Sequence, residues 1–102
     1  MNLQERSDLR SLDLHREIVK RLKEDPSLWD KPLSNIERWT NDKGELPLCY
    51  FVWKTILTTW PKEKILKLLV SRSQRATHLR SSSPFTGIID QETRNRIFKK
   101  WT

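Results

Sequence analysis

The sequence predicts an all-α protein, a compact bundle of five or six helices that forms a single domain over residues 1–102. This length suffices for one modest core, with 35% hydrophobic and 32% charged residues. Only two glycines occur, whereas strands joined by tight hairpins usually need more. Apolar residues also recur at spacings of three and four, which is the helical period.

The first helix is expected from about Ser7 to Glu24, because the apolar residues of this segment recur at helical spacing. These residues are Leu9, Leu12, Ile18, Val19 and Leu22. Ser7 suits the N-cap position, since its hydroxyl can accept a hydrogen bond from a free backbone N–H. Glu17 and Arg21 are spaced to form an ion pair on the solvated face.

Asp25-Pro26 is expected to end the first helix and to begin the second, with Asp25 as the N-cap. The second helix then runs to about Asn41. Pro32 predicts either a kink inside it or a short helix followed by a longer one that begins near Leu33. Gly44 lies in the turn that follows, where it can adopt the left-handed conformation of a C-cap.

Leu46–Trp60 is the most apolar part of the chain, and we expect it to form the central helix of the bundle. Its β-branched residues leave a buried strand as the alternative, but its length, its lack of alternation and Pro47 favour a helix. Cys49 is the only cysteine and is interpreted as a small apolar core residue. A single thiol forms no internal disulfide, which suits a reducing cytosol.

The segment 62–80 predicts two short helices, with Ser71 as the N-cap of the second. Ala76 and Leu79 are expected to face the core from that second helix. Its other side chains are expected to face solvent: Arg72, Ser73, Gln74, Arg75, Thr77, His78 and Arg80.

Ser81–Gly87 is expected to be a loop, because it combines three serines with a proline and a glycine. Phe85, Ile88 and Ile89 are expected to anchor this loop in the core. Asp90 is the predicted N-cap of a terminal helix, Gln91–Lys100, whose charges follow the order that the helix dipole favours.

Charge is unevenly distributed along the chain. Residues 1–61 hold ten Lys/Arg and ten Asp/Glu, so this half is neutral, whereas residues 62–102 hold ten Lys/Arg and three Asp/Glu, which leaves the basic half with the whole net charge of +7. A basic half of this kind indicates an acidic partner, either nucleic acid or an acidic protein surface.

The two helices of 62–80 can be aligned with a helix-turn-helix, although Val70-Ser71 replaces the glycine and apolar residue usual in its turn. The alternative is a solvated basic face on helices that pack on the core. Contacts to nucleic acid or to an acidic partner are expected at Lys62, Lys64, Lys67, Arg72, Gln74, Arg75, His78 and Arg80.

Tryptophan is frequent in this chain. Five tryptophans occur at helical apolar positions, where core or protein-interface contacts are favoured over stacking on unpaired bases: Trp29, Trp39, Trp53, Trp60 and Trp101. If one small domain cannot cover all five, the surplus apolar surface marks a site for a protein partner or for a homodimer.

No pattern typical of an enzyme occurs, and we expect no catalytic site, metal, cofactor or small-molecule substrate. His15 and His78 are far apart in sequence, and both are interpreted as solvated histidines. The N-terminus lacks the apolar region of a signal peptide, and no apolar run is long enough to span a bilayer. We therefore expect a cytoplasmic protein without membrane contact.

Three stretches carry a resemblance to a known group: L-D-L-H-R-E-I-V-K-R-L-K-E-D-P-S-L, N-I-E-R-W, and S-R-S-Q-R-A-T-H-L-R-S-S-S-P-F-T-G-I-I-D-Q-E-T-R. The chain resembles small bacterial proteins of about this length that are associated with toxin–antitoxin-like gene pairs. The S-S-P-F-x-G segment with the following E-x-R is the most specific part. The resemblance implies a partner protein, a bacterial cytosol and a defined structural or binding loop that includes Ser82, Ser83, Pro84, Phe85 and Gly87.

Together these observations predict a non-enzymatic antitoxin-like or regulatory protein. It would bind a toxin-type protein partner through amphipathic helices and its basic C-terminal half. The alternative is a DNA-binding transcriptional regulator that uses the helix-turn-helix-like segment at 62–80. Steep salt dependence of DNA binding and a dimer would distinguish this alternative.

Overall fold

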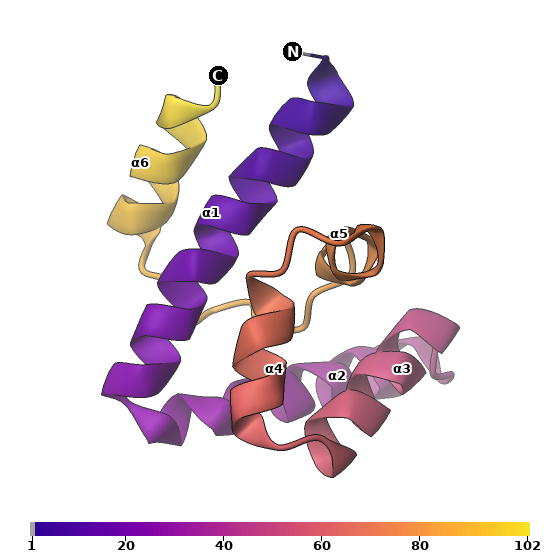
Figure 1. Cartoon of the computed structure of the whole chain (residues 1–102). Coiled ribbons are helices and arrows are strands. Elements are labelled where there is room, and N and C mark those ends of the chain that lie inside the picture. The colour runs from indigo at the N-terminus through magenta and orange to yellow at the C-terminus, as the bar shows by residue number, and fades with distance from the viewer. Residues whose placement is uncertain (1) are drawn as a thin grey trace.

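The computed structural model describes residues 2–102, and every regular element in this part of the chain is a helix (Figure 1). In chain order the elements are α1 (Leu3–Glu24), the 3₁₀ helix η1 (Pro26–Trp29), α2 (Asp30–Lys43), α3 (Leu48–Thr59), α4 (Lys62–Leu69), α5 (Gln74–Arg80) and α6 (Gln91–Lys100). The radius of gyration is 13.6 Å, as expected for a compact chain of this length. The predicted all-α bundle is confirmed.

The long helix α1 lies at the centre of the arrangement, because η1, α4, α5 and α6 all pack against it (Figure 1). It buries Leu12, His15, Ile18 and Leu22 at spacings of three and four. The prediction that Leu46–Trp60 forms the central helix is wrong. The main helical neighbours of α3 are α2 and α4, and seven of its twelve residues are exposed.

Local capping explains where the first helices begin and end. The side chain of Asn2 accepts a hydrogen bond from the backbone N–H of Glu5 at 2.7 Å, so α1 begins at Leu3 instead of near Ser7. Asp25 caps η1 as predicted, through the N–H of Ser27 at 3.1 Å. The short helix followed by a longer one also occurs, but the longer one begins at Asp30. Pro32 therefore occupies the first turn of α2, where its missing N–H costs nothing.

Two of the three caps predicted after Asp25 are confirmed. Gly44 adopts φ of 73° and ends α2, with its N–H bonded to the carbonyl of Thr40 at 2.8 Å. Asp90 caps α6, and the preceding loop is anchored by buried Phe85. The exception is α5, which Ser73 caps in place of Ser71 and which begins at Gln74.

The core lies where α1, α3, α4 and the loop before α6 meet. Its buried members are Ile18, Leu22, Ile36, Trp53, Ile56, Ile65, Leu69, Leu79, Phe85 and Ile88. Trp53 has no exposed surface, and its indole N–H donates to the carbonyl of Leu79 at 2.9 Å. Its ring also meets Phe85 edge to face, with 5.7 Å between the ring centroids.

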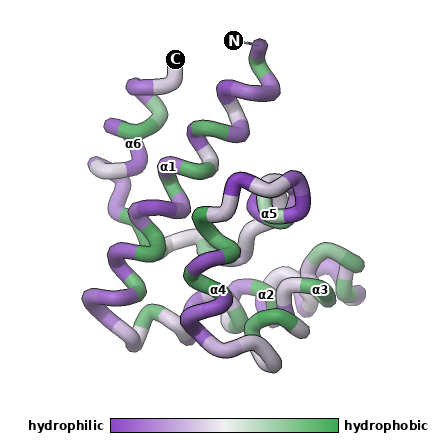
Figure 2. Tube along the Cα trace, in the orientation of Figure 1, coloured by the Kyte–Doolittle hydropathy of each residue, from purple (hydrophilic) through white to green (hydrophobic). Residues whose placement is uncertain are grey.

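One sequence-based expectation about α3 depends on its assumed central position. Cys49 is predicted to lie in the core, but it is exposed, whereas its neighbour Tyr50 packs on Trp39 of α2. The apolar side chains Leu48 and Phe51 are exposed as well, and Figure 2 shows hydrophobic positions along this helix at the edge of the bundle.

None of the helices in residues 2–102 combines the length and the apolar character that crossing a membrane requires.

Candidate functional site

The predicted binding residues divide into exposed and buried ones. Seven are exposed, three on α4 and the others at or near α5: Lys62, Lys64, Lys67, Arg72, Gln74, Arg75 and His78. The prediction that Arg80 faces solvent is wrong, because only 5% of this residue is exposed. Arg80 therefore belongs to the packing of the helices, and the other residues remain as a candidate surface.

The two charge halves of the sequence are interleaved in space, because α6 packs along α1 (Figure 1). Lys100 of α6 contacts Asp13 of α1, with 3.2 Å from Nζ to Oδ2. Arg21 of α1 contacts Asp90 at the start of α6, with 2.8 Å from Nη2 to Oδ1. Lys100 of the basic half is thus paired with an acid of the first helix, whereas Arg21 of the neutral half is paired with an acid of the basic half.

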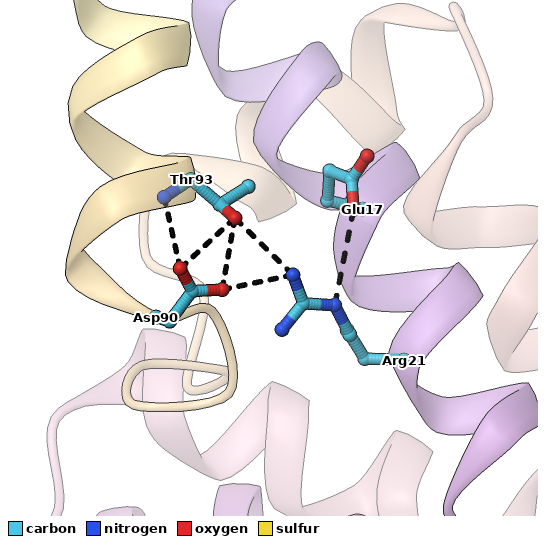
Figure 3. A network of polar contacts seen from close by, with 4 residues as sticks. All are labelled: Glu17, Arg21, Asp90 and Thr93. Atoms are coloured by element: carbon cyan, nitrogen blue, oxygen red, sulfur yellow. Dashed lines mark hydrogen bonds and ion pairs between the residues drawn. The ribbon is translucent and has the colours of Figure 1, made fainter.

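The Arg21–Asp90 pair belongs to a small network that attaches α6 to α1 (Figure 3). The backbone N–H of Thr93 donates to Asp90 at 3.0 Å, and Arg21 also donates to the Thr93 hydroxyl at 3.2 Å. Glu17 lies 3.9 Å from Arg21, which confirms the predicted ion pair. The Thr93 N–H and the Arg21 guanidinium hold the pKa of Asp90 well below its usual range, so its carboxylate stays charged as the cap of α6.

The exposed residues around α5 contrast with that network. Among residues 2–102, the side chains of Arg72, Gln74, Arg75 and His78 make no hydrogen bond and no ion pair. We call these four residues the α5 surface. Arg72, Gln74 and His78 also line one shared hollow of about 380 Å³ between α1 and α5. The structure therefore brings together the part of the predicted site that lies at α5.

Two of the three lysines of α4, Lys62 and Lys64, do not extend the α5 surface. Lys62 and Lys64 differ by about 200° around the helix axis at 3.6 residues per turn, so they point to different sides. Each lies over a tryptophan ring, with Lys62 at 5.6 Å from Trp29 and Lys64 at 4.3 Å from Trp60. These two charges are held at the ends of neighbouring elements and do not join the α5 surface.

The segment 62–80 keeps part of the expected helix-turn-helix geometry. α4 and α5 contact each other, and Ala76 and Leu79 are buried on the inner side of α5 as predicted. Gln74 and His78, four residues apart, share the outer side. Acidic Asp8 of α1 lines the same hollow as Arg72, however, which lowers the positive potential there.

Arg80 joins α5 to the end of α4. Its Nη1 donates to the carbonyls of Ser71 at 2.6 Å and of Leu69 at 3.3 Å, and Leu69 is the last residue of α4. The guanidinium therefore satisfies carbonyl groups at a helix C-terminus, where the dipole also favours a positive charge. No carboxylate lies within 4.0 Å of Arg80 in residues 2–102.

The loop of the resembled bacterial group is ordered by hydrogen bonds from two helices. Asn35 of α2 is buried, and its Nδ2 donates to the carbonyls of Pro84 and Thr86, both at 2.9 Å. Ser83 contacts His15 of α1 with 2.8 Å between Oγ and Nε2. Gly87 has φ of 90°, a backbone conformation that favours glycine. This segment is a packed part of the fold, with Ser82 half-buried at its start.

His15 is buried, so its interpretation as a solvated histidine is wrong, whereas His78 is exposed as expected. Nδ1 of His15 lies 2.7 Å from the carbonyl oxygen of Ser11, which can only accept a hydrogen bond. Nδ1 therefore carries the proton, and Nε2 accepts a hydrogen bond from the Ser83 hydroxyl. Burial, together with the charge of Arg80, lowers the pKa of His15 to about 4. The burial of His15 could have been predicted from the sequence, since this residue lies three positions from both Leu12 and Ile18 and so shares their side of the helix.

This burial predicts an acid-sensitive fold. The folded pKa of about 4 lies below the ordinary value of 6.5, so the unfolded chain binds more protons between these pH values. Stability should fall as pH decreases through that window, by roughly 3 kcal/mol in total, since one pKa unit equals about 1.36 kcal/mol. Urea unfolding at pH 7, 5.5 and 4.5 measures this change.

The matched variants for the pH experiment are His15→Gln and His78→Gln. The first should flatten the part of the pH dependence that His15 causes, and the second should leave it unchanged because His78 is exposed. Equal pH dependence in wild type and His15→Gln would show that His15 is not the titrating group.

A second hollow lies between α2 and α3. It has a volume of about 410 Å³, and its lining is largely apolar, with Leu33, Ile36 and Leu46 as its apolar residues. Lys54 and Glu37 border it, so neither charge dominates. No group of three or more His, Cys, Asp or Glu side chains that could hold a metal ion occurs within residues 2–102.

Comparison of this chain with protein-family models, with curated proteins and with solved structures found no match. The resemblance to toxin–antitoxin-associated proteins therefore stays a prediction from the sequence.

Proposed function

We propose that this protein is a non-enzymatic, antitoxin-like regulator that binds a toxin-type partner protein at the α5 surface. The observation that carries the proposal is the contrast between two sets of charges. Arg21 and Lys100 are engaged by acidic side chains of the same chain, whereas Arg72 and Arg75 have no such partner among residues 2–102. Unpaired arginines beside Gln74 and His78 are suited to an acidic protein surface.

The proposal is tested by co-expression with the product of the neighbouring gene. The double variant Arg72→Glu/Arg75→Glu should lose co-purification, because it reverses both charges of the α5 surface. Arg96→Glu/Lys99→Glu on α6 is the matched control, since both residues are exposed and the change in net charge is the same. Far-UV circular dichroism should show equal helicity for the three proteins. Undiminished co-purification of the α5 variant would contradict the proposal.

DNA binding is the second candidate, and the contact between α4 and α5 with Gln74, Arg75 and His78 on or beside the outer side of α5 favours it. Arg and Gln side chains can contact bases and phosphates from such a helix. A titration with a generic DNA duplex at low and moderate salt distinguishes the two. Binding that weakens steeply with salt, and whose salt slope falls by about one for each arginine removed, would support DNA binding.

A further inference from the structure

One side of α3 is apolar although it faces solvent. Leu48 is 77% exposed and Phe51 is 55% exposed. Thr55 and Thr59 follow at helical spacings on the same side of the helix and are also exposed, whereas Val52 at the margin of this side is half-buried and packs on the core. We call the four exposed residues Leu48, Phe51, Thr55 and Thr59 the α3 face. An exposed apolar stripe of this kind marks an interaction site more often than chance exposure.

The threonines add to the apolar character of this face. The Thr55 hydroxyl donates to the carbonyl of Phe51 at 3.0 Å, and the Thr59 hydroxyl donates to the carbonyl of Thr55 at 2.6 Å. Both hydroxyl protons are thus used within the helix, which leaves the methyl groups available for packing. The threonine hydroxyls of the α3 face therefore leave no hydrogen-bond donor unpaired when another surface covers it.

Charge further restricts what can cover this face. Lys54 is the only charged residue between Leu46 and Pro61, and it lies on the side that borders the hollow with α2. The α3 face itself is uncharged, on a protein whose net charge is +7. An acidic partner would gain little here, whereas two copies of the same basic protein could approach on this side with little repulsion.

The two ends of α3 carry opposite charges. Exposed Glu45 precedes its first turn, and Lys64 lies beside its other end, where Nζ is 4.3 Å from the ring centroid of Trp60. Asp42 and Lys43 near Glu45 cancel each other, as do Lys62 and Glu63 near Lys64, so each end keeps the sign of the named residue. When two α3 helices pack antiparallel, Glu45 of each copy lies toward Lys64 of the other, and the favourable pairing occurs twice. A parallel arrangement would instead place like charges together.

We propose that the α3 face is a homodimer interface, where two copies of this chain pack their α3 helices antiparallel around a two-fold axis. Phe51 of each copy then lies near Thr55 of the second copy, because both residues flank the middle of the helix. This inference concerns a surface other than the α5 surface and does not depend on the proposed function.

The helix has 12 residues and is about 18 Å long, so we expect the dimer to bury an area at the lower end for a specific interface. We therefore expect a reversible dimer with a dissociation constant of roughly 1–100 μM. Sedimentation equilibrium over a concentration series should show the mass rising from 12.3 kDa toward twice that value.

Phe51→Lys should weaken dimerisation by about tenfold or more, because it places a charge at the centre of the interface. Leu3→Lys is the matched control, since Leu3 is 79% exposed on α1 and the added charge is the same. A protein that stays at 12.3 kDa up to about 1 mM would overturn the proposal. The proposal would also be overturned if Phe51→Lys dimerised as strongly as Leu3→Lys.

A charge exchange tests the antiparallel arrangement. Glu45→Lys and Lys64→Glu should each weaken the dimer, and the double variant should recover most of the loss, because the pair is restored with its signs exchanged. Losses that simply add in the double variant would contradict the antiparallel pairing of these ends.

Discussion

Replacing Trp53 with Ala should lower the free energy of unfolding by about 3–5 kcal/mol, which is the range for truncating a buried aromatic residue. The side chain is fully buried, so its removal leaves a cavity in the middle of the core. The change also leaves the carbonyl of Leu79 without the indole N–H that it accepts at 2.9 Å. Because domains of this size are stable by only about 5–15 kcal/mol, the variant should be close to unfolding at 37 °C.

Urea denaturation followed by circular dichroism measures this loss. Trp53→Phe keeps an aromatic ring but removes the N–H donor, so it should lie between wild type and Trp53→Ala. Trp60→Ala is the control at a half-buried tryptophan, where a smaller loss is expected. A loss at Trp53 of less than about 1 kcal/mol would mean that this residue is not the centre of the core.

Arg80→Glu should destabilise the fold by about 3–5 kcal/mol, the cost of leaving buried charges uncompensated. The carboxylate would face the carbonyls of Leu69 and Ser71 in place of the guanidinium that donates to them. It would also stand at the C-terminus of α4, where the helix dipole disfavours a negative charge. Arg80→Met keeps much of the volume and should cost less, about 1–3 kcal/mol, for the lost hydrogen bonds.

Arg75→Glu is the matched control for this experiment, because it makes the same charge change at an exposed position of the same helix. Thermal or urea unfolding should show little effect of the control and a large effect of Arg80→Glu. Equal stabilities would contradict the buried position of Arg80. The comparison also matters for binding studies, since any loss of binding in Arg80→Glu follows from damage to the fold.

Much of the local structure could be predicted from the sequence, because short-range chemistry decides it. Asp25, Gly44 and Asp90 cap their helices as expected, and α6 covers the predicted residues. The errors at α1 and α5 arose because two polar residues competed for one role. Asn2 lies upstream of Ser7, and Ser73 lies downstream of Ser71, and spacing alone does not say which of them the backbone will use.

The candidate site was predicted less well, because side-chain environment depends on which helices meet. Arg80 and His15 have sequence neighbours typical of a solvated surface, yet both are buried where α5 and the loop before α6 pack on α1. Asn35 likewise reaches residues almost fifty positions away in the chain. No local sequence pattern indicates contacts between residues so far apart in the chain.

The sequence by itself determined the all-α class, the helix order and the apolar and charged composition of each segment, since these follow from periodicity, capping and residue type. Only the tertiary structure decided which helix is central and which apolar surface stays uncovered. The most apolar segment lies at the edge as α3, while the strongly charged α1 is the centre (Figure 2). The physical reason is that one apolar stripe along a long helix can pack against four neighbouring elements. A short helix that is covered on one side leaves its other apolar side available for a partner.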